Sequence, residues 1–506
     1  MKPQKNADVQ ALVYSGFSSL RHARFRLLRI TNAGMVRRWL RRADVCHLIK
    51  HGAQTGSEQR TGEALAIAFS YCGLRAMGLT ESDEYPFPSA FRSGMNQPDR
   101  AQALGDDDVA SWLWGDLPQG ERKAVHVLLA HYSGTPFVTG GPLDPDILER
   151  SGFEQLRQVK TCASYIEPAK ADRRPARLYE PFGFRDGLSQ PTLRPDNPPP
   201  TDNIDIDHEV AEGEFILGLV NEYGDRSYEP DARGWLKMSP PPRPRTHFGT
   251  HGTYVAVRQI LQDVAAFKSF DQANPRSQPD APSLVEKMVG RYQDGRPLIV
   301  PPPGADPVNG FRYRQTDAEG FACPIGAHVR RGNPRDTLGW DTRSGIASSK
   351  LHRLLRRARV YTEGCRQAGA CACADTGKRD CGTGLFFMAI NADLDRQFEF
   401  IQQRWIGNRQ FGDLNDEQDP LLGNGRGRFT VPGPAVGLPC PSAGPFTRVE
   451  AGGYFFLPGM DALRFLATDP HEPTEASADI VLAKCSVDQS HAEPRQQAAN
   501  PDEQRP

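Results

Sequence analysis

Short apolar runs recur along the chain, separated by polar segments that contain Gly, Pro, Asn or Asp. Runs of this length, rich in Val, Ile, Leu or Phe, are typical of β-strands. They predict strands at 24–30, 64–70, 124–133 and 159–168, and again at 253–260, 354–361, 384–391 and 452–459. Other segments have the apolar spacing of one helix face. These predict helices at 33–49, 144–156, 261–270, 394–407 and 461–467.

The order of these elements suggests that the fold is duplicated. Strand, helix, strand, strand, helix and strand follow one another in the first half, as in a ferredoxin-like unit. The second half begins again with a strand and a helix. We therefore predict an α+β protein with two ferredoxin-like domains, each an antiparallel sheet with packed helices. The predicted divisions are a disordered N-terminus (1–10), an N-terminal domain (11–245), a C-terminal domain (246–468) and a disordered tail (469–506).

The composition is that of a globular protein long enough for two domains. Of the 506 residues, 38% are hydrophobic and 24% are charged. The net charge of −1 gives no electrostatic reason to expect a nucleic-acid partner. No apolar run approaches the roughly 20 residues that span a bilayer, and none follows the N-terminus as in a secretory signal. We therefore expect a cytoplasmic protein without a membrane partner, and predict no particular oligomeric state.

Two segments contain the candidate chemistry, and the first is GFRDG. It places Arg185 and Asp186 between Gly183 and Gly187. Glycines at these positions let the backbone turn tightly and approach a ligand closely. Taken alone, the simpler interpretation is a surface turn in which the aspartate caps its own backbone. The Pro-rich stretch NPPPTDN that follows, like PPPRPR further on, predicts a loop or linker.

The second segment is GAHVRRGNPRD (326–336), with a single histidine, His328, between small residues and arginines. One neutral histidine commonly holds haem iron on its proximal side. Small residues before it would let the backbone lie close to a flat porphyrin. Arg330, Arg331 and Arg335 could then pair with the haem carboxylates. Taken alone, a loop histidine beside solvated arginines is again the simpler interpretation.

In combination, these segments resemble the dye-decolourising peroxidases. The resemblance rests on EPFGFRDGLSQP, GAHVRRGNPRD, HRLLRRARVY, GLFFMAINADLDRQFEFIQQRW and FGDLNDEQDPLLG, in this order. GxxDG alone is a weak motif, whereas GxxDG followed by the histidine segment at this spacing is specific. The resemblance extends from about residue 10 to about residue 468. It implies two ferredoxin-like domains, with b-type haem held mainly by the second.

The resemblance also implies catalytic roles. Asp186 corresponds to the family's distal aspartate and His328 to the axial ligand of the haem iron. The distal arginine, counted back from Tyr361 at the end of its strand, falls on Arg356. A distal carboxylate can accept a proton from one peroxide oxygen and return it to the other. An arginine beside it stabilises the negative charge on the leaving oxygen.

Further positions around the haem follow from the same resemblance. The two apolar residues that lie over the haem correspond to Leu385 and Phe387. The carboxylate that holds the proximal imidazole corresponds to Asp395, with Asp393 as the competing position. A carboxylate partner makes the imidazole a more basic ligand and favours the oxidised iron.

The implied activity is the oxidation of organic reductants, such as dyes or phenolics, by hydrogen peroxide. It would proceed in one-electron steps through an oxidised iron-oxo haem. The alternative is a haem-handling protein, for iron release or haem delivery, with little peroxidase turnover. Bulky reductants could pass electrons through an aromatic side chain, with Trp340, Trp405 and Tyr361 as candidates. Core packing is the simpler interpretation of each of these aromatics.

Four of the ten cysteines, Cys365, Cys371, Cys373 and Cys381, crowd into one segment. Four thiols this close can bind zinc or an iron–sulfur cluster in principle, although the usual C-x2-C pair is missing. A redox-responsive thiol pair and an inserted loop with incidental thiols are the alternatives.

A third interpretation of the whole chain ignores haem. The carboxylates of FGDLNDEQDPLLG would then form a divalent-metal or hydrolase site. Asp413, Asp416, Glu417 and Asp419 are dense enough to bind calcium weakly, but their spacing does not match an EF-hand loop. A structural turn is the simpler interpretation.

Overall fold

The computed structural model describes residues 6–55, 62–106, 108–161, 166–167, 177–195, 207–235, 246–362, 382–423, 428–433, 438–440 and 444–468. The segment expected to be a tail, the two Pro-rich stretches and the four clustered cysteines lie outside these residues. Of the expected N-terminal segment 1–10, residues 6–10 are described. Within it Val9 and Gln10 are buried, and the Gln10 side chain hydrogen-bonds the backbone of Ile67 and Pro458.

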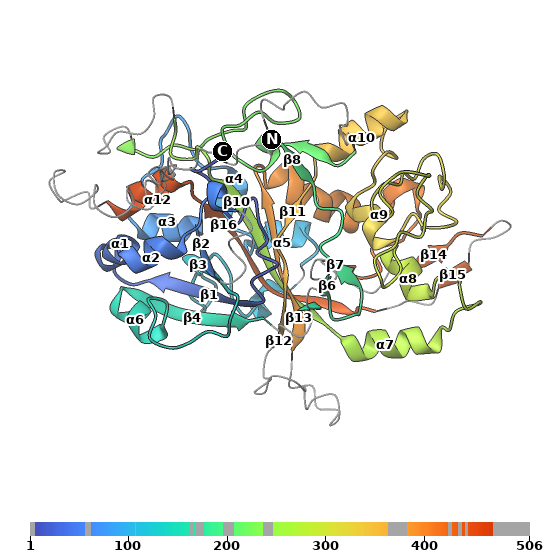
Figure 1. The fold of residues 1–506 in the computed structure, drawn as a ribbon, viewed down its shortest axis with the longest axis horizontal. Helices are drawn as coiled ribbons and strands as arrows, with labels where there is room; N and C mark the ends of the chain where they lie inside the picture. The colour runs from blue at the N-terminus through green and yellow to red at the C-terminus, as the bar shows by residue number, and fades with distance from the viewer. Residues whose placement is uncertain are drawn as a thin grey trace, which may run out of the picture.

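One antiparallel sheet of nine strands runs through the described part of the molecule (Figure 1). The first half of the chain supplies β1 (His22–Ile30), β2 (Glu63–Phe69), β3 (Val127–Ser133) and β4 (Phe153–Lys160). The second half supplies β10 (Thr253–Gln262), β11 (Leu355–Arg356), β12 (Arg359–Thr362), β13 (Thr383–Asn391) and β16 (Thr447–Leu457).

The sheet consists of two units with the same strand order. The spatial order is β4-β1-β3-β2 in the first unit and β16-β10-β13-β11 in the second, with β12 also on β13. Numbered within its own unit, each order is 4-1-3-2, the order of a ferredoxin-like unit. The two units join where Phe69 of β2 pairs with Phe456 of β16. A bridge between Thr161 and Tyr361 brings β4 and β12 together, so the sheet curls back on itself. The predicted duplicated α+β fold is confirmed.

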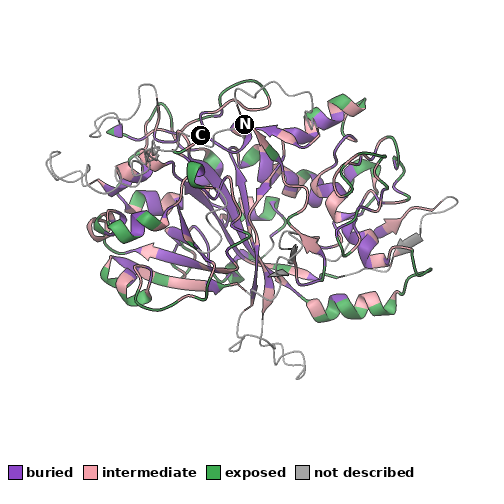
Figure 2. Cartoon of the chain, in the orientation of Figure 1, coloured by how far each residue is buried: buried purple, intermediate pink, exposed green. Residues whose placement is uncertain are grey.

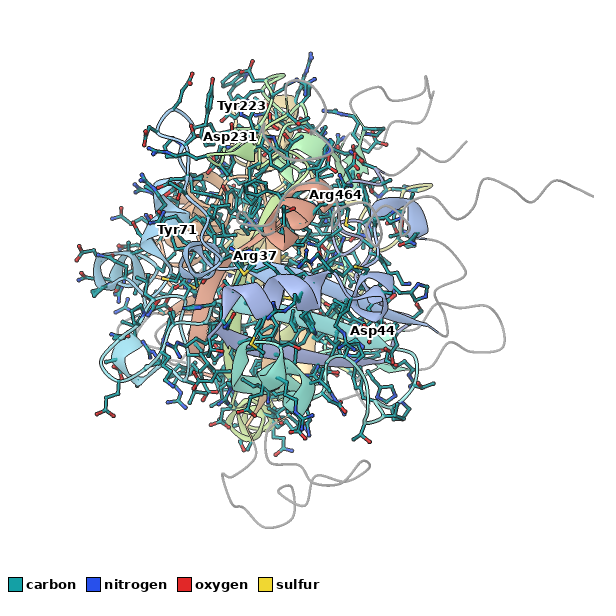
Figure 3. The ribbon with its side chains drawn as sticks, turned by 90° about the vertical axis from the view of Figure 1, so that its left-hand side faces the viewer. Arg37, Asp44, Tyr71, Tyr223, Asp231 and Arg464 are labelled. Atoms are coloured by element: carbon teal, nitrogen blue, oxygen red, sulfur yellow. The ribbon has the colours of Figure 1, made fainter. Side chains whose placement is uncertain are left out.

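Helices flank the sheet in both halves of the chain (Figure 1). The first half contains α1 (Ala33–Leu40), α2 (Ala43–Leu48), α3 (Tyr71–Ala76), α4 (Ser89–Ser93), α5 (Pro98–Ala103) and α6 (Pro145–Arg150). The second half contains α7 (Val264–Ala273), α8 (Leu284–Val289), α9 (His328–Gly332), α10 (Thr342–Lys350) and α12 (Met460–Ala467). Helix α12 packs back against α1. Figure 3 views this flank, with Arg37 of α1, Asp44 of α2 and Arg464 of α12 labelled on it.

Short strands lie outside the large sheet. They are β5 (Ile166–Glu167), β6 (Arg177–Tyr179) and β7 (Arg185–Asp186) in one antiparallel group, the parallel pair β8 (Thr192–Arg194) and β9 (Glu209–Ala211), and the antiparallel pair β14 (Phe429–Val431) and β15 (Leu438–Cys440). The group of β5, β6 and β7 matters for function because it contains the GFRDG segment.

Several predicted boundaries were wrong. The helix predicted at 144–156 ends at Arg150, and β4 begins at Phe153 rather than near 159. Gly152, with φ of 84°, turns the chain between them. A left-handed residue just after a helix is a common helix end and favours glycine. The helix predicted at 33–49 is two helices, because Arg42 has an extended backbone and begins the second.

Two elements near the centre of the second half also differ from the prediction. The strand predicted at 354–361 is interrupted, since Arg357 and Ala358 separate β11 from β12. The helix predicted at 394–407 is present but is wound as two π-helical segments, η7 (Asp395–Glu399) and η8 (Ile401–Ile406). Such wide turns are often found at functional sites.

The two faces of the sheet have different roles. Figure 2 shows the strands as mostly buried. Side chains that alternate along a strand point to opposite faces. On β10, Val255 and Val257 pack into the core inside the curled sheet, whereas Tyr254 and Ala256 pack against the helices. Further along β10 the outward face borders a cavity.

Candidate active site

The outward faces of β10 and β13 border a cavity of about 440 Å³. Arg258, Ile260 and Gln262 line it from β10, and Leu385 and Phe387 line it from β13. Each set has a spacing of two, and Arg258 is paired with Phe387 across the ladder. The alternation of the strands therefore directs these side chains to one surface. Leu385 and Phe387 thus line the cavity, and their predicted place over the haem stays a prediction.

The GFRDG segment borders the same cavity. Asp186 and Gly187 line it, and Asp186 Oδ1 accepts a hydrogen bond from the Gly187 backbone N–H at 2.6 Å. The backbone N–H of Arg185 donates to the carbonyl of Gln293, which fixes the turn from outside. Gly183 has φ of 94° and forms the turn, but it is not among the cavity-lining residues. Its predicted contact with a cofactor therefore finds no support in the lining, whereas that of Gly187 remains a prediction.

His328 lines the cavity from the first position of α9. Its Nδ1 lies 2.9 Å from Asp419 Oδ2, and the Asp419 side chain is completely buried. A carboxylate only accepts, so Nδ1 must carry a proton, and in the neutral imidazole this leaves Nε2 with a lone pair. The expectation that Asp395 holds this imidazole was wrong. Asp395 has 54% of its side chain exposed and pairs with Arg100.

A turn formed by the sequence Asp-Pro-Leu-Leu holds Asp419 in position. Its Oδ1 accepts hydrogen bonds from the backbone N–H groups of Leu421 and Leu422, at 2.9 and 2.8 Å. Burial alone would raise the pKa of Asp419, but the nearby His328 reverses this effect and holds the pKa below its usual value. Burial likewise acts to lower the pKa of His328, and the Asp419 carboxylate outweighs it, so that the net shift is upward. The two side chains thus bind each other as a charge-assisted pair.

Arg356, at the end of β11, also lines the cavity and is tied to the segment that follows GFRDG. Its Nη2 donates to the carbonyl of Leu188 at 2.6 Å, and its backbone N–H donates to Gln190 Oε1 at 3.0 Å. The neighbouring Arg353 and Arg357 line the cavity too. The choice of Arg356 among them stays a prediction, but its link to the GFRDG segment favours it.

The arginines of the histidine segment do not act as a group. Arg335 lines the cavity, as expected for a partner of haem carboxylates. Arg330 and Arg331 are not among the lining residues, so their predicted role there finds no support in the lining. Arg330 is buried against Asp317, and Arg331 donates to backbone carbonyls that include those of Trp405 and Glu417. Both arginines therefore hold the loops around α9 together.

The cavity has a strongly positive lining, which suits an anionic occupant. The arginines that line it are Arg185, Arg258, Arg291, Arg335, Arg353, Arg356, Arg357 and Arg359, against the acids Glu180 and Asp186. Several of them, such as Arg291 and Arg335, donate to neutral oxygens, which carry no compensating full charge. Burial and the nearby Arg335 lower the pKa of Arg291 to about 10.

This lining fits haem. Its two propionates would offset part of the positive charge, and the apolar walls suit a porphyrin. A cavity of about 440 Å³ is within the roughly 300–1,000 Å³ of cofactor sites. His328 offers the free ring nitrogen that iron requires.

Other candidate residues lie apart from the cavity. Trp340 is 88% exposed, whereas Trp405 and Tyr361 are buried in the core. The acidic cluster of the third interpretation does not converge. Asp416 pairs with Arg409, and Asp419 is committed to His328. No group of three His, Cys, Asp or Glu side chains that could hold a metal ion occurs among the described residues. No helix in the described part of the chain is long and apolar enough to cross a bilayer.

Comparison with known proteins also points to a haem peroxidase. No family model matches the chain. A dye-decolorizing peroxidase of Auricularia auricula-judae is 27% identical over 427 residues, which cover 79% of this chain and 75% of the relative. A multifunctional dye peroxidase of Amycolatopsis is 30% identical over 311 residues, covering 57% of this chain and 61% of that protein.

Solved structures show the same fold. A fungal peroxidase of this type from Auricularia auricula-judae superposes with a TM-score of 0.67 at 23% identity, covering 92% of this chain and 100% of that one. A dye-decolorizing peroxidase in complex with 2,6-dimethoxyphenol gives the same TM-score, identity and coverage. The chain therefore has the α+β fold of these peroxidases, and the lining of its cavity fits haem. The curated relatives and structural neighbours of this chain are dye-decolorizing peroxidases, the family that its motifs resemble.

Proposed function

We propose that this peroxidase uses hydrogen peroxide to oxidise organic reductants, such as dyes or phenolics, in one-electron steps. The observation that supports this most is the convergence of His328, Asp186 and Arg356 on one cavity, with His328 Nδ1 held by Asp419. A related peroxidase with a bound dimethoxyphenol supports a phenolic reductant.

Haem would be held by His328 Nε2 and by the arginines of the lining. Arg335 and its neighbours offer donors for the propionates, and Leu385 and Phe387 form an apolar wall that excludes water. When bound, haem would supply the two-electron reduction of peroxide and would store the oxidising equivalents until two reductant molecules arrive. Asp419 keeps the imidazole in one orientation and makes it a stronger donor to iron.

Asp186 and Arg356 have different roles in the reaction with peroxide. The Asp186 carboxylate takes the proton from one peroxide oxygen and returns it to the other, which then leaves as water. Arg356 offers N–H groups to the oxygen on which negative charge develops. The link from Arg356 Nη2 to Leu188 O keeps this guanidinium beside the segment that contains Asp186. Because these partners are fixed before peroxide enters, little reorganisation is required during the reaction.

The test is an absorption spectrum of the haem-loaded protein before and just after one equivalent of hydrogen peroxide. We expect a ferric Soret band that converts rapidly to an oxidised spectrum, and no such band in His328→Ala. A stable ferric band that ignores peroxide would favour a haem-handling protein instead. Absence of any Soret band after expression with sufficient haem would contradict both functions.

A further inference from the structure

Glu180 is a carboxyl of the cavity lining that the proton steps above do not use. Both of its oxygens have partners. Oε1 accepts from the backbone N–H of Phe184 at 2.8 Å. Oε2 accepts from the N–H of Phe182 at 3.0 Å and from Gln262 Nε2 at 2.7 Å. The side chain is thus fixed both by its own turn and by strand β10.

Gln262 supplies a second, independent observation. It lines the same cavity, and its Oε1 is buried without a hydrogen-bond partner among the described residues. The oxygen and nitrogen of an amide have nearly the same shape, so a half-turn of the amide would place Oε1 against Glu180 Oε2. In that orientation Gln262 accepts a hydrogen bond, which only a protonated Glu180 can donate. The pair therefore accommodates either protonation state of the carboxyl, with one amide orientation for each.

The surroundings favour the protonated state at moderate pH. Burial, and to a smaller extent the negative Asp186 on β7, outweigh the three hydrogen bonds and raise the pKa of Glu180 from its usual 4.5 to about 7. A further ionisable group that interacts with it is His328 at the start of α9. From β10 its partner is the neutral Gln262. Glu180 can therefore exchange a proton near neutral pH.

We propose that Glu180 stores a proton at the cavity wall and delivers it during turnover, while Gln262 turns its amide between the two states. The proposal rests on the proposed function, because reduction of one peroxide to two waters (H2O2 + 2 H+ + 2 e− → 2 H2O) consumes two protons with the two electrons. In the delivering step the O–H bond of Glu180 breaks, and its proton passes to a water-forming oxygen in the cavity. The new carboxylate then accepts from Gln262 Nε2. A proton released by the oxidised reductant, or one from solvent, restores the acid.

Infrared spectroscopy of the haem-loaded ferric protein tests this assignment directly. We expect a carbonyl band of a protonated carboxylic acid that disappears with a midpoint above the usual range of a glutamate and is missing in Glu180→Gln. Asp116, fully buried with its pKa raised to about 6, should give a second band that persists in that variant and acts as an internal reference. If no band differs between the parent and Glu180→Gln, the proposal is wrong.

Gln262→Met keeps Glu180 in place and tests the partner, even if Glu180→Gln folds poorly. The ionised form loses a charge-assisted hydrogen bond, which is stronger than a neutral one, so the midpoint should rise. An unchanged or lower midpoint would overturn the role of Gln262. In steady-state turnover, Glu180→Gln should lower kcat by about tenfold or more and increase the solvent isotope effect. A kcat and isotope effect equal to those of the parent would exclude proton delivery by Glu180.

The variant Asp186→Asn shows whether the proton-storage proposal or the proposed function has failed. It should slow the reaction with peroxide but keep the Glu180 band. If the variant slows the reaction while the parent shows no Glu180 band, proton storage is refuted and the function stands. If the band is present but the variant reacts with peroxide like the parent, the assignment of Asp186 fails while Glu180 keeps its proton.

Discussion

Asp419→Asn should weaken the hold of the protein on haem. Asp419 Oδ2 accepts from His328 Nδ1 at 2.9 Å in a completely buried environment, and Oδ1 caps the backbone of Leu421 and Leu422. Asparagine keeps the shape and the capping oxygen, but it presents a neutral amide to the imidazole. Loss of such a partner typically costs 10–100-fold in metal affinity or activity. At about 1.4 kcal/mol per tenfold, this is about 1.4–2.7 kcal/mol.

The assay is the transfer of haem from the loaded protein to an excess of apo-acceptor, followed in the Soret band, together with the rate of reaction with peroxide. Asp395→Asn is the matched control, since it makes the same chemical change at an exposed carboxylate that pairs with Arg100. It should behave within about twofold of the parent, because surface ion pairs contribute little. The reasoning would be refuted if Asp419→Asn kept both properties within that margin, or if Asp395→Asn showed the larger loss.

Three further changes test other parts of the site. Asp186→Asn and Arg356→Leu should each slow the reaction with peroxide by about 10²–10³-fold while haem stays bound, as stopped-flow spectra would show; rates like that of the parent would remove both from the reaction. Asp106→Ala leaves Arg258, its partner at 2.5 Å, as an uncompensated buried charge and should cost about 3–5 kcal/mol in urea unfolding, whereas a loss below about 1 kcal/mol would contradict this. Because the pKa of Glu180 is raised to about 7, the unfolded state binds fewer protons than the folded state between pH 4.5 and about 7. The free energy of unfolding of the parent should therefore fall across this window by roughly 2–4 kcal/mol relative to that of Glu180→Gln. Parallel pH profiles of the two proteins would show that Glu180 titrates normally.

The predicted elements succeeded where the pattern was strong and local. β1, β2 and β13 lie within two residues of their predicted ranges at both ends, because long apolar runs leave few alternatives. Predictions failed where a single residue decided the backbone. Gly152 ends α6 early, and the interruption at Arg357 and Ala358 divides a predicted strand. The sequence contained Gly152, but its positive φ becomes certain only when β4 has to begin directly after it.

The site residues were likewise predicted in part. The sequence and its family resemblance pointed to His328, Asp186, Arg356, Leu385 and Phe387, and all five line one cavity. The carboxylate partner of His328 was missed. Asp419 lies 91 positions away in the chain, and the sequence offered several acids at comparable distances. The sequence feature that could have indicated Asp419 is the Asp-Pro-Leu-Leu turn. In this turn Asp419 Oδ1 accepts from the backbone of the turn, and Oδ2 is left to bind another group.

The sequence alone determined the alternation of the strands, the duplication of the α+β unit and the two motifs around the cavity, because each depends on residues close together in the chain. Tertiary structure decided which charged groups meet. Arg331 is buried among backbone carbonyls while Arg335 reaches the cavity, although both belong to one basic segment. Asp419 rather than Asp395 holds His328, and Glu180 meets Gln262 across the join between the turn and β10. Long side chains find their partners only after distant segments have packed, and burial then fixes which pairs and which protonation states persist.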